Sequence, residues 1–165
     1  MGREYSLQDA LKLAIKAEKD SMDFYRMASA KATNERAKKV FDMLANEEVA
    51  HLKAFFDHYK GGEFGDLKSY MESPVDAKNP TYVKLLKAID DNCLEQKALE
   101  LALAEEKECI GQYTQLAQGV VDPAVRAIFT QVVKETEKHY ALIEAEYAHL
   151  MGMVSDSDVD TFVRE

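Results

Sequence analysis

The stretch FDMLANEEVAHLKAF, residues 41–55, determines the expected fold. Five of its positions follow one another in alternating steps of three and four residues, which places them on one helix face: Phe41, Leu44, Glu48, His51 and Phe55. Glu48 and His51 therefore direct a carboxylate and an imidazole toward a buried partner. Burying such groups without compensation costs roughly several kcal/mol, and a metal ion bound by both is one way to compensate them.

The Glu48–His51 pair has two interpretations. Carboxylate and neutral imidazole are good ligands for iron, manganese or zinc, and the three-residue helical spacing lets both reach one ion. The alternative is an internal Glu–His ion pair without metal. The pattern Glu-x-x-His arises readily by chance in Glu-rich helices, so its weight depends on the rest of the chain.

Three further segments carry apolar stripes with the same helical spacing. A polar group stands in the middle of each stripe: Glu18 in 7–28, Glu106 in 99–116 and His139 in 125–143. Glu18 and Glu106 could instead lie on the surface, but the neighbouring Ala, Leu and Tyr residues favour the buried face.

Capping patterns set the expected helix boundaries. They are Ser6 with Asp9, Thr33 or Asn34, Asn92 with Glu95, and Asp122 before Pro123. We expect four long helices at about 6–31, 35–59, 93–118 and 123–151. Glycine and proline between 61 and 80 interrupt the middle of the chain, so residues 60–92 form a crossover with a short helix at 81–91. One domain over 1–165 is expected, with 152–165 as a short tail.

The sequence contains an internal repeat. Shifting it by 88 residues aligns 7–59 with 95–147 without a gap and gives 12 identities in 53 positions, against about three or four expected from composition. The identities include Glu18 with Glu106, Tyr25 with Tyr113, Phe41 with Phe129, Glu47 with Glu135, and His51 with His139. Two duplicated helical hairpins joined by a long crossover predict an all-α four-helix bundle, with the polar stripe residues converging on its axis.

One candidate ligand is not repeated in the second half, because Thr136 aligns with Glu48. A threonine hydroxyl is a poor iron ligand. Glu135 lies about 40° from His139 around the helix and position 136 about 60° away on the other side, so Glu135 could replace the missing ligand. Glu47, its counterpart in the first half, is expected to be a solvated neighbour.

Tyr25 and Tyr113 each follow a candidate ligand, Glu18 or Glu106, by seven residues on the same helix face. A phenol there could donate a hydrogen bond to a ligating carboxylate, or pack as an ordinary core aromatic residue. Cys109, one turn after Glu106, is expected to be a small buried hydrophobic residue.

Charge and cysteine content exclude several classes of protein. The net charge of −9 and the pI near 5.0 argue against nucleic-acid binding and suit cation ligands. The two cysteines form no C-x-x-C pair, which favours a reducing cytoplasm over a disulfide framework. We see no apolar signal segment and no run long enough to span a membrane.

The motifs AEKDSMDFY, NEEVAHLKAF and AEEKECIGQY make the chain resemble the ferritin-like superfamily over about 6–151. Specifically, it resembles the rubrerythrin-type (erythrin) domain. The resemblance implies a non-haem di-iron centre that reacts with peroxide or oxygen, with ligands at Glu18, Glu48, His51, Glu106 and His139. Rubrerythrins usually add a rubredoxin domain with paired C-x-x-C motifs, so this chain is expected to use a separate electron donor protein.

The sequence thus predicts a rubrerythrin-like di-iron oxidoreductase that acts on a small oxidant. Two iron ions are the expected cofactor, with manganese or zinc as alternatives. One alternative function is a ferroxidase or iron-handling protein. Another is a non-catalytic helical interaction protein whose polar core fixes helix register. A homodimer is left open.

Overall fold

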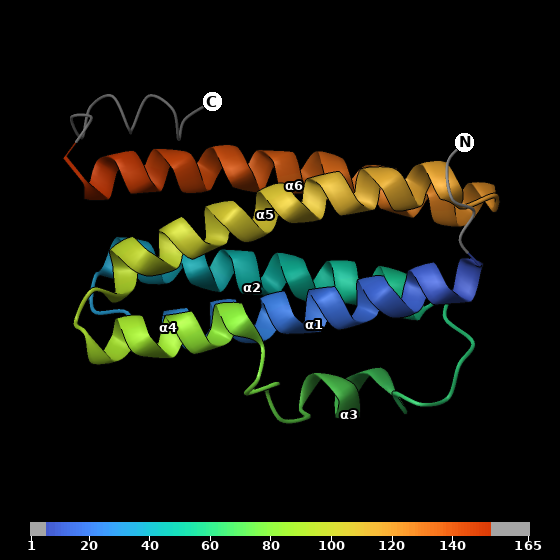
Figure 1. Ribbon diagram of the computed structural model, residues 1–165, viewed down its shortest axis with the longest axis horizontal. Coiled ribbons are helices and arrows are strands. Elements are labelled where there is room, and N and C mark those ends of the chain that lie inside the picture. The colour runs from blue at the N-terminus through green and yellow to red at the C-terminus, as the bar shows by residue number, and fades with distance from the viewer. Residues whose placement is uncertain (1–5, 153–165) are drawn as a thin grey trace.

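The computed structural model describes residues 6–152, and its folded elements are helices (Figure 1). They are α1 (Leu7–Lys31), α2 (Glu35–Phe56), α3 (Leu67–Met71), α4 (Pro80–Asp90), α5 (Leu94–Gly119) and α6 (Pro123–Leu150). The four long helices lie side by side as two hairpins, α1 with α2 and α5 with α6, which confirms the predicted all-α bundle with a long crossover.

Three of the four predicted N-caps are present. The side chains of Ser6, Asn34 and Asp122 each accept hydrogen bonds from backbone N–H groups in the first turn of α1, α2 and α6. Pro123 occupies the first turn of α6, where the missing N–H costs nothing. Gly152 follows the end of α6 with a φ of +70°, a conformation that glycine adopts easily.

The capping box predicted for Asn92 and Glu95 is wrong. Asn92 has a φ of +56°, and Cys93 takes the N-cap position of α5 without a side-chain hydrogen bond. Glu95 Oε1 instead accepts from the backbone nitrogens of Thr33, at 2.8 Å, and Asn34, at 3.1 Å. A tertiary contact between the two hairpins has therefore replaced the local cap.

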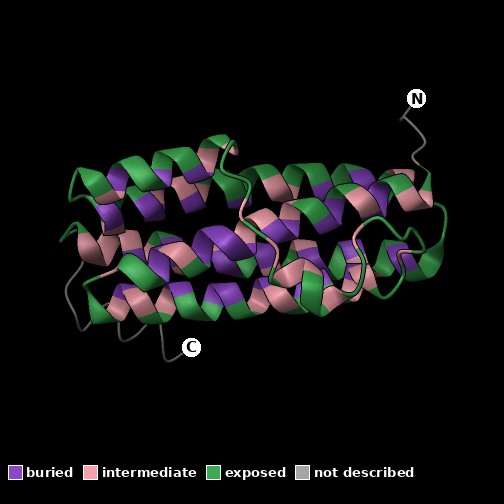
Figure 2. Cartoon of the chain, turned by 90° about the horizontal axis from the view of Figure 1, so that it is seen from below, coloured by how far each residue is buried: buried purple, intermediate pink, exposed green. Residues whose placement is uncertain are grey.

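The apolar core forms two clusters separated along the bundle axis. The inner faces of the helices are buried and their outer faces exposed (Figure 2). One cluster contains Leu11, Phe55, Tyr113 and Phe129, and the other contains Tyr25, Phe41, Leu99 and Ile143. Fully burying a side chain of this size contributes about 1.5–3 kcal/mol, so the clusters stabilise the bundle on both sides of a polar layer.

The crossover is attached to the outside of the bundle. Its predicted helix is α4, which packs against α1 and α5, whereas the short helix α3 was not predicted. Buried Lys19 on α1 pairs with Asp23 and donates to the Ser73 carbonyl of the crossover, with an N–O distance of 3.1 Å. This buried cation therefore connects the crossover to α1.

The sequence also predicted that no segment spans a membrane and that residues 152–165 form a short tail. Among residues 6–152, no helix is both long enough and apolar enough to cross a membrane. The predicted tail falls almost wholly in 153–165, outside the described residues.

Candidate metal centre

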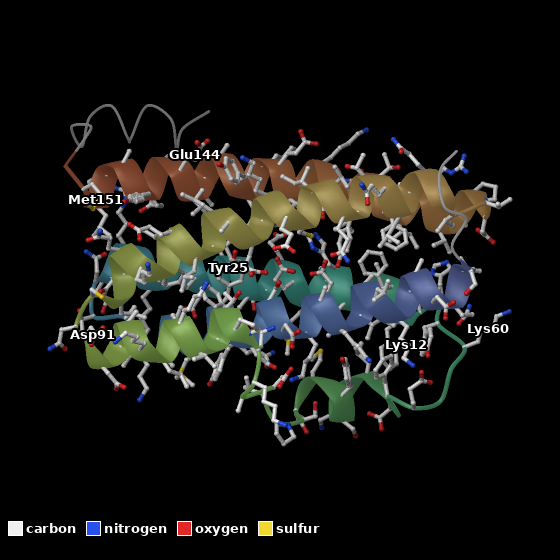
Figure 3. The ribbon with its side chains drawn as sticks, in the orientation of Figure 1. Lys12, Tyr25, Lys60, Asp91, Glu144 and Met151 are labelled. Carbon is white, nitrogen blue, oxygen red and sulfur yellow. The ribbon has the colours of Figure 1, made fainter. Side chains whose placement is uncertain are left out.

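Five predicted ligand residues lie together in the polar layer between the two apolar clusters. They are Glu18 on α1, Glu48 and His51 on α2, Glu106 on α5 and His139 on α6, and their exposed fractions are 2–7%. Figure 3 shows the inward side chains between these helices, with Tyr25 labelled among them. The stripe periodicity thus predicted correctly that these five side chains are buried.

The five residues form two overlapping groups. Ligand atoms of Glu18, Glu48 and His51 all lie within 4.8 Å of one another, and so do those of Glu48, Glu106 and His139. Glu48 belongs to both groups, so each has two carboxylates and one imidazole. This arrangement can hold two cations with Glu48 between them.

The two predicted tyrosines hydrogen-bond to these carboxylates. Tyr25 Oη donates to Glu106 Oε1 at 2.6 Å, and Tyr113 Oη donates to Glu18 Oε1 at 2.9 Å. Both rings are buried. Both tyrosines thus make the predicted kind of hydrogen bond, each to the other hairpin, and their rings also pack in the apolar clusters.

The histidines face glutamates on their outer side. His51 Nε2 lies 2.6 Å from Glu135 Oε2, and His139 Nε2 lies 3.9 Å from Glu47 Oε2. The Nδ1 atoms of both rings are buried without a hydrogen-bond partner, and Nδ1 of His51 lies 3.6 Å from Glu18 Oε2. A carboxylate on one ring nitrogen is a common way to orient an imidazole whose other nitrogen binds a metal.

Residue 136 departs from the repeat, whereas its neighbour Glu135 follows it. Thr136 is buried, but its Oγ1 donates to the Val132 carbonyl oxygen at 2.7 Å, so the hydroxyl is satisfied within α6. Glu135 lies with His51 and Glu47 in a third group, on the outer side of His51. Its replacement of the missing ligand beside His139 stays a prediction.

Glu47 is a residue whose contact the sequence reasoning missed. It was expected to be a solvated neighbour, and its side chain is indeed 44% exposed, yet it faces His139. The signal was present in the repeat, because Glu47 and Glu135 are an identical pair at equivalent positions. Each outer glutamate lies near the histidine of the other hairpin.

The electrostatics of the centre reflect crowded carboxylates. Burial and repulsion from Glu18 raise the pKa of Glu48 well above its usual value. Burial also raises the pKa of Glu106 to about 7, although the hydrogen bond from Tyr25 opposes this. Burial lowers the pKa of His51, but Glu18 and Glu48 outweigh it and raise the value to about 11.

These residues fit a pair of divalent cations. Glu18 Oε2, His51 Nδ1 and His139 Nδ1 are buried without hydrogen-bond partners, which is costly unless another group binds them. Carboxylate and imidazole donors suit iron, manganese and zinc. Divalent charge would also favour the ionised forms of Glu48 and Glu106, whose pKa values are raised by burial and by neighbouring carboxylates.

Comparison with protein families gave a match to the rubrerythrin family over residues 9–147. This range covers most of the chain and includes every residue of the two overlapping groups. The comparisons with curated proteins and with solved structures gave no match.

Proposed function

The chain belongs to the rubrerythrin family of ferritin-like di-iron proteins, and on this premise we propose that it is an oxidoreductase that reduces peroxide or oxygen. The observation that carries the proposal is the position of Glu48, which is shared by two buried groups of two carboxylates and one imidazole. Such a donor set holds two redox-active ions close together.

The proposal assigns the ligands by these groups. Glu18, Glu48 and His51 would hold one iron, and Glu48, Glu106 and His139 the other. When bound, two ferrous ions supply one electron each, which together with two protons convert hydrogen peroxide into two waters. The electrons would come from a separate donor protein, since the two cysteines of this sequence form no C-x-x-C pair.

The other residues of the centre hold the ligands in place. Tyr25 and Tyr113 donate hydrogen bonds from their phenol O–H groups to Glu106 and Glu18, which fixes both carboxylates. Glu135 orients the His51 ring through Nε2. The apolar clusters on either side limit water and so strengthen the electrostatic interactions of the centre.

A ferroxidase or iron-handling function is the second candidate. The third group, Glu47, His51 and Glu135, favours it because its two glutamates are only partly buried and lie on the outer side of His51. Such a group offers a cation a binding position between solvent and the buried carboxylates. A non-catalytic interaction protein, the third alternative, would need no metal at all.

Stopped-flow kinetics separates these functions. Protein loaded anaerobically with ferrous ion is mixed with hydrogen peroxide or with oxygen, and iron oxidation is followed by absorbance. We expect the faster reaction with peroxide and repeated turnover when reductant is supplied. Faster reaction with oxygen, together with accumulation of ferric iron, would favour the ferroxidase. Protein that binds neither iron nor manganese nor zinc would leave only the interaction protein.

A further inference from the structure

A cavity of about 520 Å³ lies between α1, α4 and α5 and extends inward to residues of the centre. Its inner wall contains Glu18, Tyr25 and Tyr113. These are the two tyrosine donors of the hydrogen bonds between the hairpins and one of the two glutamate acceptors. These three side chains are only 1–2% exposed, so the polar layer lies directly behind the inner end of the cavity.

Small side chains leave this space open. Ala17 and Ser21 on α1 and Ala102 on α5 all line the cavity. Larger residues at these positions of adjacent helices would fill the gap between them. α4 lies beside this face, next to α1 and α5 (Figure 1).

The mouth of the cavity is formed by the beginning of α4. Asn79 Nδ2 donates to Asp20 Oδ2 on α1 at 3.3 Å, and Thr81 Oγ1 donates to Glu105 on α5. With Glu108, three carboxylates lie at the mouth and Glu18 is a fourth deeper in the cavity, against the single cation Lys84. A mouth with this charge disfavours anions.

A second hollow, of about 330 Å³, lies on the opposite side over α2 and α6. It reaches His51 and Glu135, but their 2.6 Å hydrogen bond stands between it and the buried carboxylates. Glu18 and the tyrosine hydroxyls line the first cavity and not this one.

We propose that a small uncharged oxidant, of the class of hydrogen peroxide, reaches the centre through the cavity between α1 and α5. The proposal rests on the proposed function and adds the route and the charge selection. Inside the cavity, the Tyr25 and Tyr113 oxygens and the Glu18 carboxylate offer hydrogen bonds to a neutral hydroxylic molecule. An anionic oxidant meets three carboxylates instead.

The first test uses Cys109 as a reporter, because it lines the cavity and the only other cysteine is the exposed Cys93. In metal-free Cys93→Ser protein, Cys109 is labelled at pH 8.5 with neutral methyl methanethiosulfonate or its anionic sulfonatoethyl analogue. The ratio of the labelling rates of the two reagents at Cys109 is compared with the same ratio at an uncharged model thiol. We expect this comparison to favour the neutral reagent at Cys109 by about tenfold, and by less at high salt. No preference would overturn the charge selection.

The second test fills each hollow in turn. Ala17→Leu narrows the cavity and Ala54→Leu is the matched control in the second hollow, since both alanines are half-buried. We expect Ala17→Leu to slow both Cys109 labelling and iron oxidation by peroxide by about tenfold, with unchanged iron content. Ser21→Leu should do the same if Ala17→Leu disturbs folding.

The outcomes separate the route from the proposed function. Slower reaction in Ala54→Leu, or unchanged rates in both Ala17→Leu and Ser21→Leu, would overturn the route while leaving the oxidoreductase intact. Iron-loaded wild type that reacts with neither peroxide nor oxygen would refute the oxidoreductase, and Cys109 labelling would then be the remaining test of the cavity.

Discussion

Tyr25 on α1 donates a hydrogen bond to Glu106 on α5, with 2.6 Å between Oη and Oε1. Its counterpart in the repeat, Tyr113 on α5, donates to Glu18 on α1. Each tyrosine thus serves the carboxylate of the other hairpin. The two bonds position the centre from both halves of the chain at once, so the metal site depends on the packing between hairpins.

Tyr25→Phe tests the role of this bond. Losing the donor leaves Glu106 less well fixed, so we expect the affinity for the ion at Glu106 to fall about tenfold or more. Competition with a chromophoric chelator measures this. Tyr147→Phe is the control, because Tyr147 donates to Glu100 outside the centre, at 2.7 Å. Equal losses in the two variants would contradict the assigned role.

Glu48 is the one residue shared by both groups, so its removal should have the larger effect. We expect Glu48→Gln to lose both ions and His139→Gln to lose one, as measured by elemental analysis of protein whose helix content is checked by circular dichroism. A Glu48→Gln variant that keeps the wild-type metal content would show that Glu48 does not bridge.

The mismatch at residue 136 predicts unequal sites. His139 lacks the glutamate three residues before it that His51 has in Glu48, so we expect two resolved steps in an anaerobic ferrous titration. Thr136→Glu restores the repeat and should tighten the weaker step by about 10- to 100-fold.

Glu135→Ala decides the role of Glu135 in the same titration. If Glu135 orients His51, as their 2.6 Å contact suggests, the step at His51 should weaken about tenfold. If Glu135 is the replacement ligand beside His139, only the weaker step should disappear. Two equal binding steps that neither Thr136→Glu nor Glu135→Ala changes would show that α6 already supplies its full set of ligands.

The stability of metal-free protein should depend on pH through Glu106. Its folded pKa of about 7 lies above the ordinary 4.5, so the folded state holds this proton more tightly than the unfolded state. The stabilising effect is complete below pH 4.5 and is lost as the pH rises through 7. Glu106→Gln should therefore raise the free energy of unfolding at pH 8 by on the order of 1–3 kcal/mol, and hardly at pH 4.

Urea unfolding of chelator-treated protein at both pH values measures this difference, with Glu144→Gln at an exposed position of α6 as the control. A gain in stability that is the same at pH 4 and pH 8 would mean that the charge of Glu106 is not its cause. The variant should also bind less metal, because stability and ligation make opposite demands on this buried carboxylate.

Much of the fold was predictable because helical periodicity is a local property. The steps of three and four residues identified the buried faces, and the 88-residue repeat indicated two hairpins. Glu18, Glu48, His51, Glu106 and His139 followed from the same stripes, since a polar residue in an apolar stripe is buried with it. Local patterns failed at Asn92, where a tertiary contact of Glu95 competed with capping.

The partners of these side chains were not predictable from one sequence. The rotation of each helix and the side-chain rotamers decide which glutamate accepts the hydrogen bond from Tyr25 and which histidine faces Glu135. The cavity likewise depends on where α4 lies against α1 and α5, and the spacing of residues in 60–92 does not determine this.

Anomalous scattering at the iron and zinc edges, on a crystal of iron-loaded protein, tests the two-ion centre most directly. We predict two iron peaks between the four long helices, one beside Glu18, Glu48 and His51 and the other beside Glu48, Glu106 and His139. A single peak outside His51, between Glu47 and Glu135, or no peak in the bundle, would contradict it.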